Sequence, residues 1–265
     1  MTWWQLVLIG YAVIIVVMAA LWYVQKVRKN AGIVDVAWAF GTGLLGVFFA
    51  VGATSGDPTR RMLIGTLAGI WGLRLGIYLA RRVAREAEDG RYKRLREQWG
   101  DKTQRYLFIF FQVQAFWAVM FAAPMLVAAM NGDRAFGALD IIGFAIGLMA
   151  IIMESVADRQ LAKFKMRPDS AGKVCNQGLW RYSRHPNYFF EWTHWFAYVL
   201  MAMGFAFGWL AWFGPVIMLF FLLKVTGIPP TEAQTLRSRG DAYREYQRTT
   251  SVFFPWPPKK KEVPS

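Results

Sequence analysis

The run WWQLVLIGYAVIIVVMAALWYV, residues 3–24, contains no charged residue. As an α-helix with a rise of about 1.5 Å per residue it would be about 33 Å long, enough to cross a hydrocarbon core of about 30 Å. It is also longer than the apolar part of a cleaved signal peptide, which has about 7–15 residues. We therefore interpret it as a first transmembrane span.

Six further apolar stretches follow the first, each long enough or nearly long enough to span a bilayer. They are Ile33–Val51, Met62–Ala80, Leu107–Met130, Ile141–Ala157, Tyr188–Gly204 and Trp209–Ile228. The last two are separated only by residues 205–208, so they are either a tight hairpin or two imperfect spans. The sequence predicts an all-α polytopic membrane protein with about seven transmembrane helices.

The composition agrees with a bilayer as the solvent. The chain is 55% hydrophobic, whereas soluble domains average about 45–50% even when Gly is counted. Short connections leave no room for a separate globular unit, so we expect one transmembrane domain over residues 1–265, ending in a Pro- and Lys-rich tail at 255–265. One cysteine and two histidines exclude an internal disulfide and make a metal site built from these residues unexpected.

The net charge of +14 is sorted along the chain. One set of alternate connections, together with the carboxyl-terminal tail, holds 26 of the 31 Lys and Arg residues. Cytoplasmic loops of membrane proteins carry such an excess. We therefore expect the amino terminus outside and the carboxyl terminus in the cytoplasm. Because topology explains the basic excess, nucleic acid is not an expected partner, whereas membrane lipids are.

Ionisable residues inside spans are costly and by default mark function. Here they are Asp35, Arg74, Glu154, Asp158, Glu191, His194 and Lys224. With the orientation above, all of them fall in the cytoplasmic half of the membrane. Snorkelling to the interface could explain the Arg and the Lys, but for the acids we favour one polar cavity open to the cytoplasm. Glu154 and Asp158 share one helix face, as do Glu191 and His194.

The densest polar segment runs from Asn176 to Glu191. Gly178 permits a turn and His185-Pro186 interrupts the backbone before the sixth span. Cations around this segment would suit a ligand with several phosphates, although the positive-inside rule also accounts for them. These cations are Lys163, Lys165, Arg167, Lys173, Arg181 and Arg184.

The run Gly178-Leu-Trp-Arg-Tyr-Ser-Arg-His-Pro-Asn-Tyr188, followed by Glu191, resembles the carboxyl-terminal signature of the steroid 5α-reductase superfamily, which includes the sterol C14 reductases. Ile33-Val-Asp-Val-Ala-Trp38 is typical of its uncharacterised bacterial branch. The run Arg239-Gly-Asp-Ala-Tyr-Arg-Glu-Tyr246, leading to Phe253-Phe-Pro-Trp256, agrees with it. The resemblance covers roughly Ile33 to Lys259 and implies a protein of the bacterial inner membrane.

This resemblance implies an NADPH-dependent reduction of an activated C=C bond in a steroid or similar apolar enone. It also implies that NADPH is held among the carboxyl-terminal helices, at about residues 140–258. The residues assigned to the cofactor on this basis are Arg74, Glu154, Asp158, Lys165, Lys173, Arg184, His185, Asn187, Tyr188, Glu191, Lys224, Glu232, Arg239 and Tyr243.

The substrate side departs from the family pattern. The 5α-reductases place a Gln-Glu pair in the second span and a Tyr in the third, and the pair has no counterpart here. Hydride delivered to an enone carbon builds negative charge on the oxygen, which requires a donor. Asp35, kept protonated by a low dielectric, and Tyr78 are the candidate catalytic donors. Asp35 is equally well interpreted as a cap of the second helix.

Two other classes of function compete with a reductase. Isoprenylcysteine carboxyl methyltransferases carry a similar Arg-His-Pro-x-Tyr run, so an S-adenosylmethionine-dependent membrane methyltransferase is the main alternative. A lipid-binding or transport scaffold is the third possibility. The phosphates of NADPH would need many cations, whereas S-adenosylmethionine has no phosphate, and the basic set around residues 163–184 therefore favours NADPH. The sequence does not indicate an oligomeric state.

Overall fold

The computed structural model describes residues 1–259, and within this range every regular element is a helix. The last part of the predicted Pro- and Lys-rich tail, residues 260–265, lies outside it. The five longest helices are α1 (Trp3–Arg28), α2 (Ile33–Gly52), α3 (Pro58–Arg85), α5 (Thr103–Ala129) and α6 (Ala138–Lys165). The shorter ones are α4 (Gly90–Trp99), α7 (Pro186–His194), α8 (Phe196–Ala202), α9 (Phe213–Phe220), α10 (Ile228–Arg239) and α11 (Asp241–Thr249).

Six helical stretches of the described chain are long and apolar enough to cross a membrane. The all-α class and the membrane assignment are thereby confirmed, and the protein is an integral membrane protein. The predicted sixth span, Tyr188–Gly204, is not one long helix but two short ones, α7 and α8, with Trp195 between them. Together they cover residues 186–202, about 25 Å of helix, which is slightly less than the hydrocarbon thickness.

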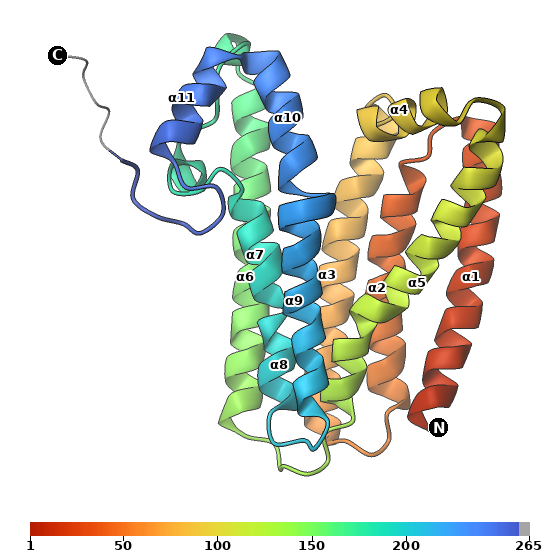
Figure 1. Cartoon of the computed structure of the whole chain (residues 1–265). Helices are drawn as coiled ribbons and strands as arrows, with labels where there is room; N and C mark the ends of the chain where they lie inside the picture. Colours follow the sequence, from red (N-terminus) through yellow and green to blue (C-terminus); the bar gives the residue numbers. More distant parts are fainter. Residues whose placement is uncertain (260–265) are drawn as a thin grey trace. The chain divides into compact units, whose positions relative to one another are not determined.

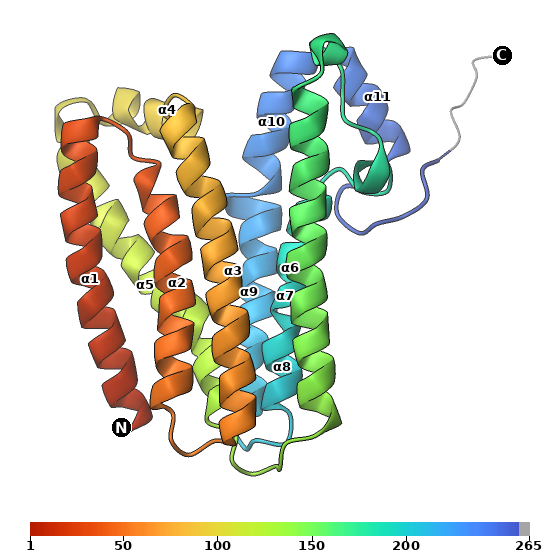
Figure 2. The ribbon, with the colours of Figure 1, turned by 180° about the vertical axis from the view of Figure 1, so that it is seen from behind.

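The helices cluster into two compact units. The N-terminal unit comprises Met1–Phe144 and Tyr198–Ala211, and the C-terminal unit comprises Ala145–Ala197 and the chain from Trp212 onward. Figure 1 shows α1, α2, α3 and α5 side by side in the first unit, and Figure 2 shows the same helices from behind. In the second unit α10 and α11 form a hairpin close to the end of α6.

Glycines allow α2 and α3 to pack closely where they cross in the N-terminal unit. A Cβ atom on Gly43 would lie 2.7 Å from the Cα of Gly72, and one on Gly72 would lie 2.8 Å from the Cα of Gly43. The two backbones therefore touch, which only glycine allows. Glycine at these two positions therefore serves helix packing. Beside the crossing, Trp38 packs edge-on against Trp71 and Phe121, with ring centroids 5.9 and 5.3 Å away.

The end of the N-terminal unit that carries few basic residues is closed by a buried ion pair. Arg60 and Asp140 are both fully buried, with Nε and Oδ1 2.6 Å apart. Arg60 also donates to the backbone carbonyl of Asn131, whose side-chain amide donates to the carbonyl of Met201 at 2.9 Å. Asp57 caps α3 just before Arg60 by accepting from its backbone N–H. These contacts join the start of α3, the α5–α6 connection and residue 201.

Aromatic side chains hold the chain after α11 against α7 in the C-terminal unit. Phe253 and Phe254 lie with their ring centroids 5.7 and 5.8 Å from that of Trp192, and both also contact Phe189. The backbone N–H of Trp256 donates to the carbonyl of Tyr182 at 2.9 Å. The carboxyl-terminal segment is therefore part of the packed unit as far as residue 256.

Candidate functional site

The signature run begins with a turn that excludes a side chain. Gly178 has a φ of +60°, and a Cβ atom on it would lie 2.5 Å from Oε1 of Gln160 on α6. The same oxygen accepts from the backbone N–H of Leu179 at 2.9 Å. Trp180 then inserts its indole towards α6 and donates to the carbonyl of Ala157 at 2.9 Å. Glycine at this position thus lets the run pack directly onto α6.

Glu232 on α10 gathers the polar residues that follow. Its Oε1 lies 2.7 Å from Nε of Arg184 and 3.2 Å from Nε2 of His185, and its Oε2 accepts from the amide of Gln247 at 3.0 Å. Arg184 also donates to the backbone carbonyls of Gln247 and Thr250, at 3.1 and 2.7 Å. One carboxylate therefore fixes the signature run, α10 and α11 to one another. We call Arg184, His185, Glu232 and Gln247 the Glu232 cluster.

Two tyrosines extend the Glu232 cluster. The ring of Tyr188 stacks on that of His185, with centroids 5.4 Å apart and planes 4° apart, and its hydroxyl lies 3.3 Å from the hydroxyl of Thr231. Tyr243 is buried on α11. Burial lowers the pKa of His185 below its ordinary value and raises that of Tyr243, so both rings are uncharged at neutral pH.

The polar faces of α6 and α7 meet. The amide nitrogen of Asn187 donates to Oδ1 of Asp158 at 3.2 Å, whereas the buried amide oxygen of Asn187 has no hydrogen-bond partner within residues 1–259. Glu154 and Glu191 stand four residues from Asp158 and Asn187 on the same helix faces, and both are buried, at 6% exposed each. The Asp158–Asn187 hydrogen bond joins the two helices at this point, and a shared cavity with Glu154, Glu191 and His194 stays a prediction.

The other predicted cofactor residues of the C-terminal unit have separate positions. Lys165 is exposed at the end of α6, and Lys173 pairs with Asp169, Nζ to Oδ2 3.1 Å. Lys224 is exposed in a π-helical turn, η5 (Phe221–Val225). Arg239 ends α10 with one buried guanidinium nitrogen that has no hydrogen-bond partner in the described chain. None of these four cations contacts the Glu232 cluster through a hydrogen bond or ion pair that the structure records.

The predicted substrate-side residues lie in the N-terminal unit. Asp35, in the first turn of α2, accepts from the hydroxyl of Tyr92 at 2.7 Å and pairs with Arg91 at 3.2 Å, both on α4. Asp35 therefore ties α4 to the start of α2, and here it acts as an acceptor. On α3 the guanidinium of Arg74 lies 5.8 Å from the ring centroid of Tyr78, whose side chain is 40% exposed. A single cavity that joins these residues to the C-terminal unit stays a prediction.

Sequence reasoning missed three polar residues of the N-terminal unit. Tyr92 is 3% exposed, although it sits in a stretch rich in charges of both signs. Gln112 on α5 has both amide atoms buried, and Thr42 on α2 has a buried hydroxyl, and none of these atoms has a partner in the part of the chain that is described. Neutral polar residues cost less than ionisable ones inside a span, so the sequence does not mark them as functional.

Comparisons with known proteins place the chain in a family. A protein called "Uncharacterized protein C594.04c" of Schizosaccharomyces pombe is 30% identical over 270 residues, which cover 89% of this chain and 75% of the yeast protein. No solved structure matches the chain. Residues 21–250 match the model of a family described as "Protein of unknown function (DUF1295)", and the chain belongs to this family.

Proposed function

We propose that this protein is an NADPH-dependent membrane reductase that transfers hydride to an activated C=C bond of an apolar, lipid-like enone. The resemblance of the signature run to the steroid 5α-reductase superfamily supplies the reaction class. The observation that carries the proposal is the meeting of α6 and α7 at Asp158 and Asn187. A reductase of this kind needs a buried place for a dihydronicotinamide, and this is the best candidate for it in the C-terminal unit.

The chemistry of the Asp158–Asn187 pair fits the nicotinamide end of the cofactor. A carboxamide has two N–H donors and one acceptor, and the buried oxygen of Asn187 is an acceptor without a partner. A buried acceptor left without a donor costs about 1–3 kcal/mol, so a ligand that donates to it gains affinity. When bound, NADPH would supply the hydride, and these residues would orient its carboxamide.

The same acceptors favour one alternative. Glu154, Asp158 and Glu191 are buried acids, and the ammonium and sulfonium groups of S-adenosylmethionine would also suit an acidic pocket. A membrane methyltransferase of the isoprenylcysteine type is therefore the second candidate. The two cofactors differ in charge, so a direct binding measurement can show which of them the protein binds.

The test is a thermal titration of the detergent-purified full chain with NADPH, NADH and S-adenosylmethionine. A ligand at about 100 times its Kd stabilises the folded state by about 2.7 kcal/mol. We expect NADPH to raise the transition temperature of the wild type and of the exposed-amide control Gln234→Ala, but not that of Asn187→Ala. Stabilisation by S-adenosylmethionine alone would favour the methyltransferase hypothesis over the reductase hypothesis. An equal NADPH response in Asn187→Ala would show that NADPH does not bind where α6 and α7 meet.

We assign the donor for the substrate oxygen to the N-terminal unit, where Asp35 and Tyr78 are the candidates. Loss of one oxyanion donor costs about 10²–10³ in rate. Asp35→Leu, which removes the donor, Asp35→Asn, which keeps an N–H donor, and Tyr78→Phe are to be compared by single-turnover rate and by melting temperature. If Asp35 is the donor, Asp35→Leu should be slower than Asp35→Asn. A donor role lowers the rate at unchanged stability, whereas loss of the contacts of Asp35 to α4 lowers the melting temperature.

We also propose the orientation and the compartment: a bacterial inner membrane, with the amino terminus outside and the carboxyl terminus in the cytoplasm. The charged connections Lys26–Lys29 and Arg81–Arg105 fall at the same end of the N-terminal unit in Figure 1, as this proposal requires. A reporter fused after Lys261 should be active in the cytoplasm, and one inserted at Gly56 should face outside. A cytoplasmic Gly56 reporter would reverse the assignment.

A further inference from the structure

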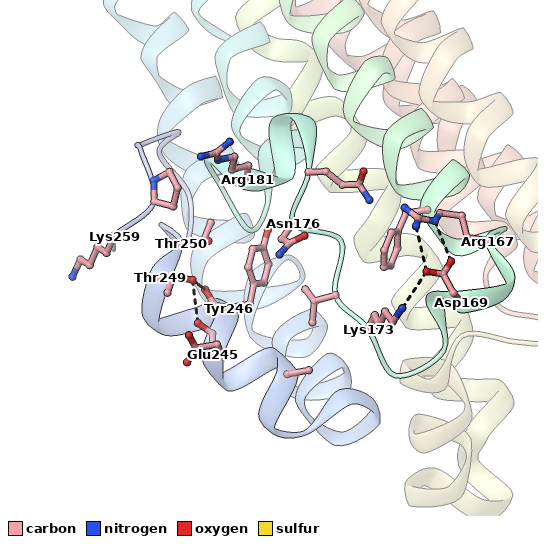
Figure 3. Close-up of a pocket in the computed structure, with 15 residues that line it drawn as sticks. Arg167, Asp169, Lys173, Asn176, Arg181, Glu245, Tyr246, Thr249, Thr250 and Lys259 are labelled. Carbon is pink, nitrogen blue, oxygen red and sulfur yellow. Dashed lines mark hydrogen bonds and ion pairs between the residues drawn. The ribbon is translucent and has the colours of Figure 1, made fainter. Parts of the chain in front are cut away.

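A polar groove lies at the end of the C-terminal unit, beyond the last turn of α6. Its volume is about 580 Å³, within the range of about 300–1,000 Å³ typical of small-ligand pockets. Figure 3 shows it between two walls: Arg167, Asp169 and Lys173 on one side, and Tyr246, Thr249 and Thr250 of α11 and its end on the other. The buried side chains of Phe164 and Tyr246 contribute aromatic surface to it.

The rim of this groove is basic. Its lining contains the four cations Arg167, Lys173, Arg181 and Lys259 against the two acids Asp169 and Glu245. Within residues 1–259 the side chains of Arg181 and Lys259 make no hydrogen bond or ion pair, and Lys259 is instead fixed through its backbone N–H, which donates to the carbonyl of Thr249 at 2.9 Å. These two cations of the lining therefore have no counter-charge within the described residues.

The other two cations already hold an anion between them. Both oxygens of Asp169 lie 3.2 Å from nitrogens of Arg167, and Oδ2 lies 3.1 Å from Nζ of Lys173. Arg and Lys thus stand on either side of one carboxylate, which is the arrangement that binds a phosphate oxygen pair. Asp169 is half exposed, so a stronger anion can displace it at small cost.

We propose that this groove binds a phosphate group carried by a small ligand, with Arg167 and Lys173 releasing Asp169 to hold it and Arg181 adding positive charge from the opposite side of the groove. The volume exceeds the needs of inorganic phosphate alone, so the phosphate belongs to a larger molecule. Two sources share this chemistry, a phosphorylated nucleoside and a phospholipid headgroup. The inference does not depend on the proposed reductase, because Asn187 does not line the groove, so that Asn187→Ala and the groove variants test separate sites.

Removing the negative charge of Asp169 should increase the affinity of the groove for phosphate. Asp169→Asn takes away the competing anion, and we expect it to tighten binding by up to about fivefold in Kd. Its control is Asp241→Asn, which makes the same change of charge on α11 at a residue that is 93% exposed and lies outside the groove. Misfolding cannot explain a gain in affinity.

A loss variant completes the design. Lys173→Gln with Arg181→Gln removes two cations of the groove, and loss of two charge-assisted contacts should weaken binding by about tenfold or more. Its control is Arg244→Gln with Arg248→Gln, which removes two exposed cations of α11 that do not line the groove. Both pairs lower the net charge of the unit equally, so a general electrostatic effect would appear in both.

The probes are inorganic phosphate, adenosine 2′,5′-bisphosphate and dihexanoyl phosphatidic acid, titrated against the full chain in detergent at constant ionic strength. We expect a saturable rise in transition temperature with at least one probe, a tighter Kd in Asp169→Asn and a weaker one in the loss variant, with both controls unchanged. The probe that binds best identifies the source of the phosphate. No saturable response to any probe, equal responses of the loss variant and its control, or no gain in Asp169→Asn would each overturn the proposal.

Discussion

The Glu232 cluster makes a sharp prediction about stability, which Glu232→Gln tests. The carboxylate of Glu232 is 17% exposed and lies within hydrogen-bond distance of Arg184, His185 and Gln247. Glutamine has the same shape but only one acceptor oxygen and no charge, so the guanidinium of Arg184, 10% exposed, loses its counter-charge. A hydrogen bond to a charged group is worth about 1.5–3 kcal/mol. The terminal amide of the new Gln would also point a donor at that of Gln247.

We therefore expect Glu232→Gln to lower the unfolding free energy by about 2–3 kcal/mol. For a chain of this size that corresponds to a fall of about 5–10 °C in melting temperature. The assay is thermal unfolding in detergent, followed by tryptophan fluorescence. The control is Glu97→Gln, an exposed residue of α4, which should melt like the wild type. A Glu232→Gln protein that melts together with this control would show that the cluster does not hold the signature run in place.

Three further changes test separate parts of the fold. Gly72→Ala puts a methyl group 2.8 Å from the Cα of the facing glycine and should cost about 1–3 kcal/mol in a denaturant titration, whereas Gly69→Ala, whose Cβ would have its nearest neighbour at 3.5 Å, should be tolerated. Arg60→Met breaks a fully buried ion pair and should cost about 3–5 kcal/mol in the same titration. Burial depresses the pKa of His185 in the folded protein. As the pH falls below the ordinary value of 6.5, His185 therefore takes up a proton more readily in the unfolded state than in the folded state. Stability is therefore lost on acidification from that value, and melting curves of His185→Asn between pH 7.5 and pH 5 should show a smaller loss than those of the wild type.

The spans could be predicted because hydropathy is a local property. Four of the first five predicted spans lie within a helix of the structure, and Leu107–Met130 extends one residue beyond α5. The glycines that face each other at positions 43 and 72 carry a recognisable small-residue pattern. The break between α7 and α8 could not be predicted in the same way. No Pro or Gly stands near Trp195, so the interruption depends on tertiary packing. The π-helical turn at Lys224 likewise has no sequence signal.

The candidate site could be predicted only in part, for a related reason. The signature run is continuous in sequence and could therefore be recognised directly. The spacing of Asp158 from Glu154 predicts that the two residues share a helix face. The partners that fix these residues are distant: Glu232 stands 47 positions after His185, and Asn187 stands 29 after Asp158. The same holds for Tyr92, which is 57 positions from Asp35. A pair contact of this kind has no local signature, and only the folded chain reveals it.

The C-terminal unit also sorts its charges along α6, and desolvation explains the direction. The buried acids Glu154 and Asp158 precede the exposed cations Lys163 and Lys165 by about two turns. Lys and Arg stay charged near neutral pH and reach for water or an anion. The acids occupy the inner turns, where Asp158 accepts a hydrogen bond from the amide of Asn187, while the cations collect at the helix end, where the groove begins. A ligand bound along this gradient would have to carry its hydrogen-bond donors at the inner end and its negative charge at the outer one.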